Sequence, residues 1–307
     1  MTVRHLLSIH DLSKGEVQEL FDLAAKIKAD PQDYRAVLAG KTLGMIFQKS
    51  STRTRVSFEV GTFQLGGHAL FLSSRDIQLG RGETISDTAQ VLSRYLDGIM
   101  ARTFSHQDVV DLAAYGSIPV INGLTDDLHP CQALTDYFTL QEIFGNLEGR
   151  KIAYVGDGNN MAHSLLFGAP KVGMDIAVAT ARGYEVSSYY LDLARADAEA
   201  AGTRIVTTHD PAAAVAGASA VYTDVWASMG QEEEQAKRVK AFAGFTVDEE
   251  LMARARKDAV FLHCLPAHRG EEVSAGVADG PQSRIFDEAE NRLHVQKAIL
   301  VSLMGGS

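Results

Sequence analysis

Short apolar runs that alternate with helical patterns constrain the fold of this 307-residue chain more than any other feature. We interpret nine such runs as buried strands, and the segments between them mostly repeat apolar residues about every 3.6 positions, as amphipathic helices do. This alternation is typical of βα units that build a parallel sheet. Because nine strands exceed one comfortable sheet, we predict an α/β fold with two doubly wound parallel-sheet domains joined by interdomain helices. The predicted strands are Leu43–Phe47, His68–Leu72, Gly98–Ala101, Pro119–Ile121, Ile152–Val155, Ile176–Ala179, Arg204–Val206, Val221–Thr223 and Val260–Leu262.

A glycine-containing turn at residues 145–149 marks the predicted domain boundary, because it follows a predicted helix, Ala133–Phe144. Length alone also favours roughly two domains. We therefore predict a first domain over residues 1–145 and a second over residues 146–287, with the helix crossing between them. The remaining residues, 288–307, contain a further predicted helix, which could end the second domain or pack back on the first.

The composition excludes several classes of protein. A formal net charge of −10 argues against nucleic acid or an anionic membrane as the main partner. No apolar run reaches the ~18 residues that a membrane-spanning helix needs, and the N-terminus lacks the pattern of a secretory signal. The two cysteines, Cys131 and Cys264, stand in neither a CxxC nor a zinc-binding spacing, which favours a reducing compartment. We expect a cytoplasmic protein.

Hydroxyl and guanidinium groups are concentrated in the segment Ser51–Arg55, between the predicted strand Leu43–Phe47 and a helical pattern that starts at Val56. Backbone N–H groups and the positive dipole end at a helix N-terminus form an anion site. Arg53 and Arg55 can add bidentate contacts to phosphate. The alternative is an ordinary Ser/Thr cap with two solvated arginines, but a cap needs one hydroxyl and this turn supplies several. We predict a site for a phosphate-bearing ligand, and call Ser51–Arg55 the phosphate turn.

The segment His129-Pro130-Cys131-Gln132 follows a predicted strand and opens a helix, at the sheet edge where open α/β sheets bind ligands. A His and a Gln on one turn can both reach a carbonyl oxygen and polarise it. An ordinary helix start, with Pro near its first position and a polar cap, explains the same residues equally well.

The segment Gly156-Asp157-Gly158-Asn159-Asn160 follows another strand and could begin a dinucleotide-binding fingerprint. Two features argue against this function. Met161 stands where the third glycine belongs, and the strand that ends at Ala179 is followed by no acidic residue for a ribose. We therefore expect no dinucleotide, and instead two asparagine amides at a helix N-terminus, suited to a carboxylate.

Two further segments follow predicted strands. Asp224 and Ser228 are four residues apart, so that a carboxylate and a hydroxyl could share one ammonium group, although an Asp at such a place often just caps the next turn. His263-Cys264-Leu265-Pro266 ends the strand Val260–Leu262, and a Cys there is more often a small buried hydrophobe than a catalyst.

Taken in order, STRTR, HPxQ, GDGNN, DxxxSMG and HCLP resemble the motifs of the aspartate and ornithine carbamoyltransferase family, from Ser51 to Arg292. The resemblance implies transfer of the carbamoyl group of carbamoyl phosphate to the δ-amine of L-ornithine, in arginine metabolism, with no cofactor and no metal. DxxxSMG and HCLP favour ornithine over aspartate, putrescine or an acylated ornithine, which sibling enzymes would use. A non-catalytic phosphate-binding relative is a further alternative, but such a relative would be expected to have lost an arginine of the phosphate turn or HPxQ.

The resemblance also implies roles for single residues. The catalytic group is Arg102, His129, Gln132, Cys264 and Arg292. Carbamoyl phosphate is expected to contact Ser51, Thr52, Arg53, Thr54, Gln78, Arg102, His129, Pro130, Cys131, Gln132, Cys264, Leu265 and Arg292. Ornithine is expected to contact Asn160, Asp224, Ser228 and Met229. Family members form homotrimers in which the counterpart of Gln78 reaches the phosphate of a neighbouring subunit, so we expect shared active sites.

Overall fold

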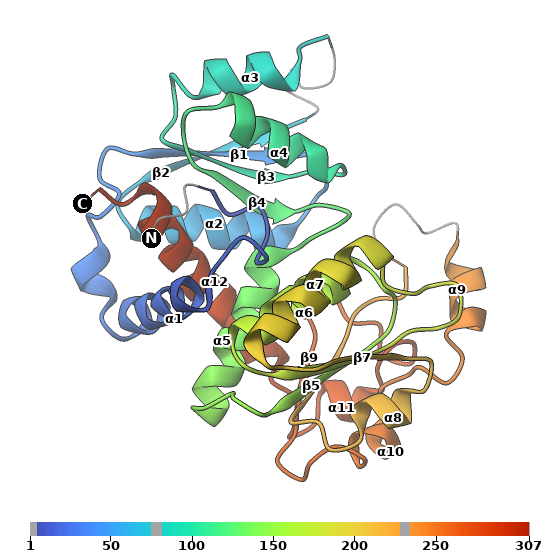
Figure 1. Ribbon diagram of the computed structural model, residues 1–307. Helices are drawn as coiled ribbons and strands as arrows, with labels where there is room; N and C mark the ends of the chain where they lie inside the picture. The colour runs from blue at the N-terminus through green and yellow to red at the C-terminus, as the bar shows by residue number, and fades with distance from the viewer. Residues whose placement is uncertain (1–4, 75–81, 228–233, 307) are drawn as a thin grey trace. The chain divides into compact units, whose positions relative to one another are not determined.

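The computed structural model describes residues 5–74, 82–227 and 234–306 (Figure 1). The chain divides into two compact units. Unit 1 comprises Met1–Leu134 and Asn291–Ser307, and unit 2 comprises Thr135–Glu290. The limits between the units fall inside two helices, α5 (Pro130–Phe144) and α12 (Ile285–Met304).

Unit 1 contains a parallel sheet of four strands in the order β2-β1-β3-β4 within its described residues. Helices α3 and α4 cover one face, where they bury a shared apolar cluster, and α2 lies on the other face (Figure 1). The strands are β1 (Thr42–Phe47), β2 (His68–Ser73), β3 (Gly98–Arg102) and β4 (Val120–Leu124). The helices are α1 (Lys14–Ala29), the short η1 (Pro31–Tyr34), α2 (Thr52–Gln64), α3 (Ile85–Leu92) and α4 (His106–Tyr115).

Unit 2 contains a parallel sheet of five strands in the order β7-β6-β5-β8-β9 among the residues described. Helices α6 and α7 lie on one face and α8, α10 and α11 on the other (Figure 1). The strands are β5 (Lys151–Val155), β6 (Asp175–Ala179), β7 (Ile205–Thr208), β8 (Ala220–Thr223) and β9 (Val260–Leu262). The helices are α6 (Asn160–Lys171), α7 (Ser188–Ala201), α8 (Pro211–Val215), α9 (Gln235–Ala241), α10 (Glu249–Met252) and α11 (Ala275–Ala278).

The predicted α/β fold with two doubly wound parallel sheets is confirmed, and each of the nine predicted strands is present. The largest shift concerns β4, which was predicted at Pro119–Ile121 and runs from Val120 to Leu124. Pro119 has no N–H to donate to a neighbouring strand, so the strand begins after it. Gly123 can lie within the strand because it has no side chain; a Cβ at this position would lie only 2.4 Å from the sulfur of Met100.

Helix α2 exposes an apolar stripe made of Val56, Val60 and Phe63, the last of which is 79% exposed. These residues are spaced as one face of a helix, and α2 is indeed helical there. The buried side of α2 instead carries Thr54 and Phe58. We refer to the three exposed residues as the α2 stripe.

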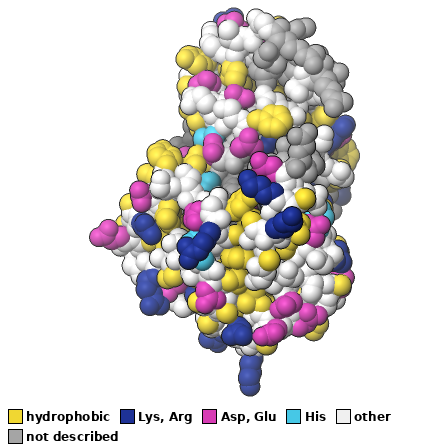
Figure 2. All heavy atoms as spheres, turned by 90° about the vertical axis from the view of Figure 1, so that its right-hand side faces the viewer, with side chains coloured by type: hydrophobic (Ala, Val, Ile, Leu, Met, Phe, Trp, Pro, Cys, Tyr) yellow, Lys and Arg dark blue, Asp and Glu magenta, His cyan; other side chains and the backbone are white. Residues whose placement is uncertain are grey.

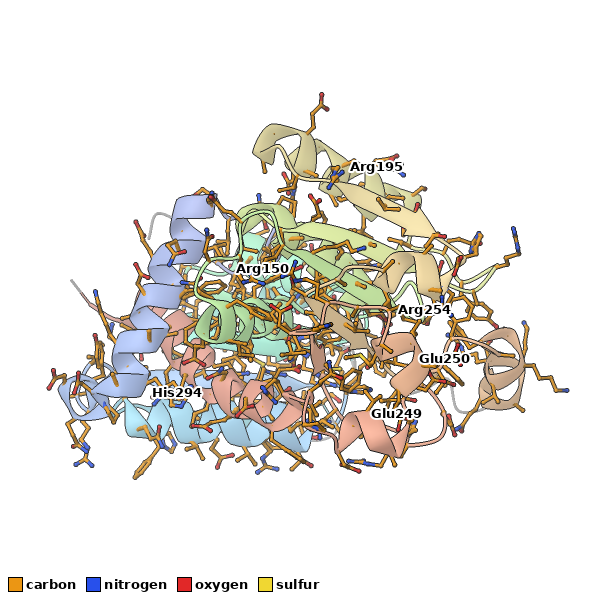
Figure 3. All side chains as sticks on the ribbon, turned by 90° about the horizontal axis from the view of Figure 1, so that it is seen from below. Arg150, Arg195, Glu249, Glu250, Arg254 and His294 are labelled. Carbon is orange, nitrogen blue, oxygen red and sulfur yellow. The ribbon has the colours of Figure 1, made fainter. Side chains whose placement is uncertain are left out.

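Charged side chains of both signs are interspersed with apolar ones over the face shown in Figure 2. Charged side chains also form local contacts. Figure 3 labels Glu250 and Arg254, an exposed ion pair at 3.4 Å, and Arg150, whose guanidinium carbon lies 4.2 Å from the ring centroid of Phe144 at the end of α5. Among the described residues, no helix is both long and apolar enough to span a bilayer.

Candidate active site

The phosphate turn lies at the carboxyl end of β1, where α2 begins, as the sequence predicts. Ser51 is the N-cap residue of α2, and its Oγ accepts a hydrogen bond from the backbone N–H of Thr54 at 3.2 Å. Thr52 and Arg53 are exposed in the first turn of this 13-residue helix. The turn therefore presents the backbone N–H groups and positive dipole end that favour an anion.

The two arginines of the phosphate turn differ in direction. The guanidinium of Arg55 lies over the ring of Phe71 in β2, 3.8 Å from its centroid, and pairs with Glu59 at 3.4 Å. Arg55, which the sequence offered as a phosphate ligand beside Arg53, is thus engaged with the edge strand of the sheet. Arg53 is the arginine of the turn that remains a candidate for the anion.

Four buried polar side chains gather in unit 1 beside the phosphate turn: Arg102, His129, Gln132 and Arg292. Arg292, from the part of α12 that belongs to unit 1, donates one N–H to Oε1 of Gln132. Its other terminal nitrogen lies 3.3 Å from Oγ1 of Thr54. The structure therefore brings together three residues that are far apart in the sequence, and it directs the hydroxyl of Thr54 to Arg292.

His129 is held as a neutral imidazole. Burial lowers its pKa well below the ordinary value of 6.5, and the charges of Arg292, Arg102 and Arg53 lower the pKa further. A neutral imidazole can donate one hydrogen bond without adding charge, while the guanidinium groups supply the positive potential. This combination suits a polarised carbonyl oxygen beside an anion.

Cys131 and Pro130 lie in the first turn of α5. Burial raises the pKa of the Cys131 thiol to about 12, and the thiol donates to the carbonyl oxygen of Asn122 at 3.4 Å. This contact connects the start of α5 to β4. Cys131 thereby helps to position the helix that carries Gln132.

In unit 2, Asn159 rather than Asn160 makes the hydrogen bonds that hold the segment Gly156–Asn160 in place. It is the N-cap residue of α6, and its Oδ1 accepts from the N–H groups of Met161 and Ala162 at 2.9 and 3.2 Å. Its Nδ2 donates to Oδ2 of Asp224 at 2.8 Å. This contact was not predicted from the sequence, although Asn is a preferred N-cap residue.

Gly158 is required by the chain's own backbone. A Cβ at this position would lie 2.4 Å from the carbonyl carbon of Glu185 and from the nitrogen of Val186. The N–H of Gly158 also donates to the carbonyl of Tyr184 at 2.9 Å. The loop after β6 thus fills the space through which a pyrophosphate would approach in a dinucleotide fold.

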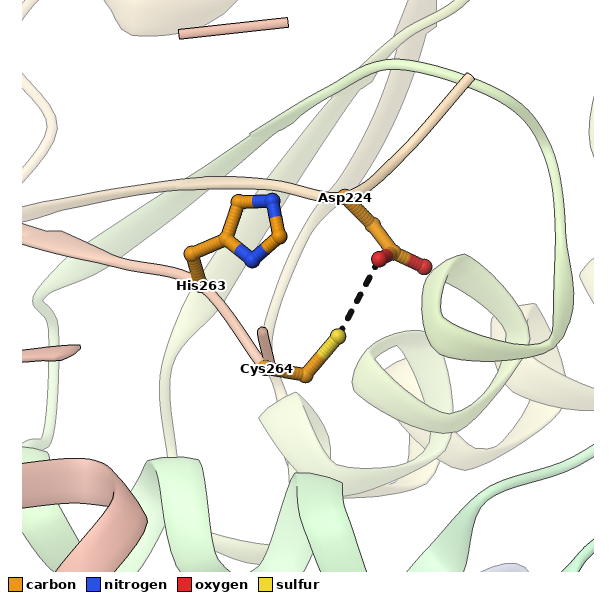
Figure 4. Close-up of side chains that lie close together, drawn as sticks. All are labelled: Asp224, His263 and Cys264. Carbon is orange, nitrogen blue, oxygen red and sulfur yellow. Dashed lines mark hydrogen bonds between the residues drawn. The ribbon is translucent and has the colours of Figure 1, made fainter. Parts of the chain in front are cut away.

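Asp224, at the end of β8, is buried and accepts several hydrogen bonds. Its Oδ1 accepts from the thiol of Cys264 at 3.1 Å, as Figure 4 shows, and from the N–H of Val225 at 2.8 Å. Burial, and after it the negative charge of Asp224, raises the pKa of Cys264 well above its ordinary range. Cys264 is therefore a protonated hydrogen-bond donor, not merely a small apolar residue.

His263 supports the backbone of the segment that follows it. Its Nδ1 accepts from the N–H of Leu265 at 2.8 Å, and its Nε2 lies 3.3 Å from Oε1 of the buried Glu272. Leu265 has a φ of 60°, which a non-glycine residue adopts only when its surroundings hold it. Glu272 was not identified from the sequence.

Within the described residues, two clusters each offer three metal-ligand atoms within 4.8 Å of one another: Asp224 with His263 and Cys264, and His268 with Glu271 and Glu272. Ligation by a cysteine needs a thiolate, whereas the environment of Cys264 favours the thiol. Both ring nitrogens of His263 also lie against other groups. The first cluster is organised as a set of hydrogen bonds.

Three of the predicted site residues, Gln78, Ser228 and Met229, lie outside the described residues. The other predicted residues for carbamoyl phosphate lie in unit 1, except Cys264 and Leu265, which lie in unit 2 with Asn160 and Asp224.

Comparison with known proteins gives matches over nearly the whole chain. The family model for the aspartate/ornithine carbamoyltransferase carbamoyl-P binding domain matches residues 4–142, and the model for the Asp/Orn binding domain of that family matches residues 148–303. An ornithine carbamoyltransferase of Anoxybacillus flavithermus is 58% identical, over 98% of this chain and 96% of that protein. Another, from Caldicellulosiruptor saccharolyticus, is 56% identical over 97% and 98% of the two chains. The solved structure of ornithine carbamoyltransferase from Pyrococcus furiosus matches with a TM-score of 0.95 and 53% identity, over 99% of this chain and 98% of that one.

Proposed function

Because this chain belongs to the aspartate/ornithine carbamoyltransferase family, we propose that it is an enzyme that transfers the carbamoyl group of carbamoyl phosphate to the δ-amine of L-ornithine, giving L-citrulline and phosphate. The observation that carries this proposal is the environment of His129. A neutral imidazole among arginine side chains, beside a helix N-terminus, suits a ligand that presents a phosphate and a carbonyl oxygen together.

Carbamoyl phosphate binds in unit 1. Ser51, Thr52 and Arg53 hold the phosphate at the start of α2, and Gln78 joins them from a neighbouring subunit. Arg102, His129 and Gln132 hold the carbonyl oxygen. Arg292 donates to Oε1 of Gln132, and this contact helps to orient the amide group of Gln132.

Ornithine binds through residues of unit 2. The donors to Asp224 that are described above, an amide, a thiol and a backbone N–H, are all neutral. They orient the carboxylate without cancelling its charge, so it attracts the α-ammonium group of ornithine. Asn160, Ser228 and Met229 complete the contacts to the amino acid, and Cys264 and the carbonyl of Leu265 lie by its δ-amine.

The reaction needs no cofactor, because phosphate is already a good leaving group. The neutral δ-amine forms a C–N bond to the carbamoyl carbon, and the electron pair of the carbonyl moves onto its oxygen. Arg102, His129 and Gln132 stabilise this oxyanion. The oxyanion then re-forms the C=O bond as the C–O bond to phosphate breaks, and phosphate leaves with the electron pair of the broken bond. The attacking amine loses a proton, which the phosphate accepts.

We propose that the protein assembles as a homotrimer with shared active sites. The α2 stripe, together with Leu70 and Phe71 of the edge strand β2, leaves large apolar side chains exposed in unit 1. Exposed large apolar side chains are frequent at protein interfaces, and a second copy of the chain is the proposed partner. Gln78 follows β2 by a few residues, so an interface at β2 brings Gln78 to the neighbouring subunit.

The proposed function also assigns a role to each domain and a cellular compartment to the protein. Residues 1–145 form the carbamoyl-phosphate-binding domain and residues 146–287 the ornithine-binding domain. The segment 288–307 packs back on the first domain, which is supported by the grouping of Asn291–Ser307 with the N-terminal part of the chain. Both cysteines are free, as suits a cytoplasmic enzyme of arginine metabolism.

A citrulline-formation assay with a panel of amines tests the proposal. The purified protein is incubated with carbamoyl phosphate and, in separate reactions, L-ornithine, aspartate, putrescine or N-acetylornithine. Ornithine should be carbamoylated fastest, by orders of magnitude, because putrescine has no carboxylate and N-acetylornithine has no free α-ammonium for Asp224. Equal or faster turnover of another amine would assign the protein to a sibling activity, and no turnover with bound carbamoyl phosphate would indicate a non-catalytic relative.

A further inference from the structure

Lys49 is a buried cation that the mechanism above does not use. It lies two residues before Ser51, its side chain is 7% exposed, and its ammonium group forms an ion pair with the carboxylate of Asp126. The same ammonium lies over the ring of Phe104, 4.7 Å from the centroid. A buried lysine is costly unless it is paired, so these contacts indicate a specific role.

The three residues of this contact come from three different loops. Lys49 follows β1, Phe104 follows β3 and Asp126 follows β4. Because the strand order is β2-β1-β3-β4, the side chain of Lys49 extends from the end of β1, past the loop after β3, to the loop after β4. Each loop carries a part of the carbamoyl phosphate site close by.

Hydrogen bonds of backbone N–H groups connect the same loops. The N–H of Phe104 donates to Oε1 of Gln48 at 3.1 Å, and the N–H of Asp126 donates to the carbonyl of Phe104 at 2.9 Å. The N–H of Gln48 donates to the carbonyl of Arg102 at 2.8 Å. The side chain of Lys49 thus adds an ionic contact to three loops that hydrogen bonds already connect.

The turn from Asp126 to His129 is short and closed. The N–H of Thr125 donates to the carbonyl of Leu128 at 2.8 Å, and the N–H of Leu128 donates to Oγ1 of Thr125 at 3.1 Å. Asp126 lies inside the turn that these bonds close, and His129 directly follows its last residue, Leu128.

We propose that Lys49 and Asp126 are positioning residues for carbamoyl phosphate, whose ion pair across Phe104 sets the phosphate turn, Arg102 and His129 in mutual register. This role rests on the proposed function. Such pre-organisation matters because the protein must contact the phosphate and the carbonyl oxygen of one small ligand at the same time. A displacement of a contacting residue by about 1 Å can cost on the order of 10²-fold in rate.

A double-mutant cycle tests the pair, with Lys49→Met, Asp126→Asn and the double variant. The readouts are the Kd of carbamoyl phosphate by calorimetric titration and the kcat and KM of citrulline formation. Lys49→Met should weaken carbamoyl phosphate binding or lower kcat/KM about 10- to 100-fold. Asp126→Asn should act in the same direction, and the double variant should be little worse than Lys49→Met alone. Lys49→Arg, which keeps the charge over Phe104, should restore part of the loss.

Lys171→Met is the matched control, because Lys171 pairs with Asp197 at 3.3 Å with both side chains largely buried, in unit 2 and outside the proposed site. Thermal unfolding of all variants separates lost stability from lost binding. Lys171→Met should lower stability without changing the Kd of carbamoyl phosphate. Asp126→Asn, whose parent side chain is 59% exposed, keeps the test open if Lys49→Met does not fold.

The possible outcomes are distinct. Additive effects of the two substitutions would overturn the proposal. Normal binding in Asp126→Asn beside a severe loss in Lys49→Met would also overturn it, and would indicate that Lys49 contacts the phosphate directly. An active wild type with unchanged variants would overturn the positioning role alone. A wild type that neither binds carbamoyl phosphate nor forms citrulline would overturn the proposed function and this inference with it.

Discussion

The thiol of Cys264 donates a hydrogen bond to Oδ1 of Asp224, with 3.1 Å between sulfur and oxygen. Asp224 directly follows β8 and Cys264 follows β9, and these strands are neighbours in the sheet of unit 2. Because the raised pKa of Cys264 keeps the thiol protonated, the pair consists of a neutral donor and a carboxylate. Cys264 therefore does not neutralise the negative charge of the carboxylate.

Removing that charge should affect ornithine far more than carbamoyl phosphate. In Asp224→Asn the buried site no longer compensates the α-ammonium group, so kcat/KM for ornithine should fall on the order of 10²-fold or more. The Kd of carbamoyl phosphate, measured by titration without ornithine, should change little. Asp175→Asn, at the ion pair with Arg204 on the surface of unit 2, is the control. Equal loss for both substrates in Asp224→Asn would contradict the assigned role.

The arginines of the phosphate turn should differ in importance. Arg53→Ala should lose about 1.5–3 kcal/mol of transition-state binding, or roughly 10- to 100-fold in kcat/KM for carbamoyl phosphate. Arg55→Ala should cost much less in this parameter, because its guanidinium lies over Phe71. Steady-state kinetics of the two variants, at matched oligomeric state, check the difference. A larger loss in Arg55→Ala would reverse the assignment.

Stability should fall in acid partly because of His129. Its pKa is lowered in the folded protein, so below the ordinary value of 6.5 the unfolded chain binds a proton that the folded chain does not. This residue's contribution is therefore fully present above pH 6.5, and it decreases by up to about 1.4 kcal/mol per pH unit as the pH falls below that value. Urea unfolding between pH 5 and 8 measures the slope. His129→Gln should flatten this slope.

Shared active sites predict complementation between inactive subunits. If Gln78 reaches the phosphate of a neighbouring subunit, a mixed assembly of Gln78→Ala and Arg53→Ala subunits should contain some sites that carry neither change. Activity should then reappear after the two variants are dissociated and reassembled together. Each variant reassembled alone is the control. Proven subunit exchange without recovered activity would exclude sharing through Gln78.

Much of the fold could be predicted because its signals are local. The strand at Leu43–Phe47 is apolar within a few residues, and Ser51 is a helix cap through its own neighbours. The order of the five motifs is also a property of the chain alone, and it indicated the family that the comparisons show. Helix ends shifted by a few residues, as at Pro130, because the caps and turns there depend on contacts beyond the local pattern.

Partners that lie far apart in the chain could not be predicted in this way. The sequence contains two arginines in the phosphate turn, but it does not show that the guanidinium of Arg55 lies over the ring of Phe71 in the neighbouring strand. It contains two adjacent asparagines, but the contact across 65 residues selects Asn159 as the one that holds Asp224.

The sequence by itself determined the strands, the helix caps and the chemical groups at the strand ends, because these depend on periodicity and on neighbours along the chain. Only the tertiary structure decided which of these groups meet. Arg292 binds Gln132, 160 residues away, and Lys49 reaches Asp126 across Phe104. The physical reason is that a parallel sheet brings the carboxyl ends of non-consecutive strands to one edge, where the surrounding burial and charge then set each side chain's direction and protonation.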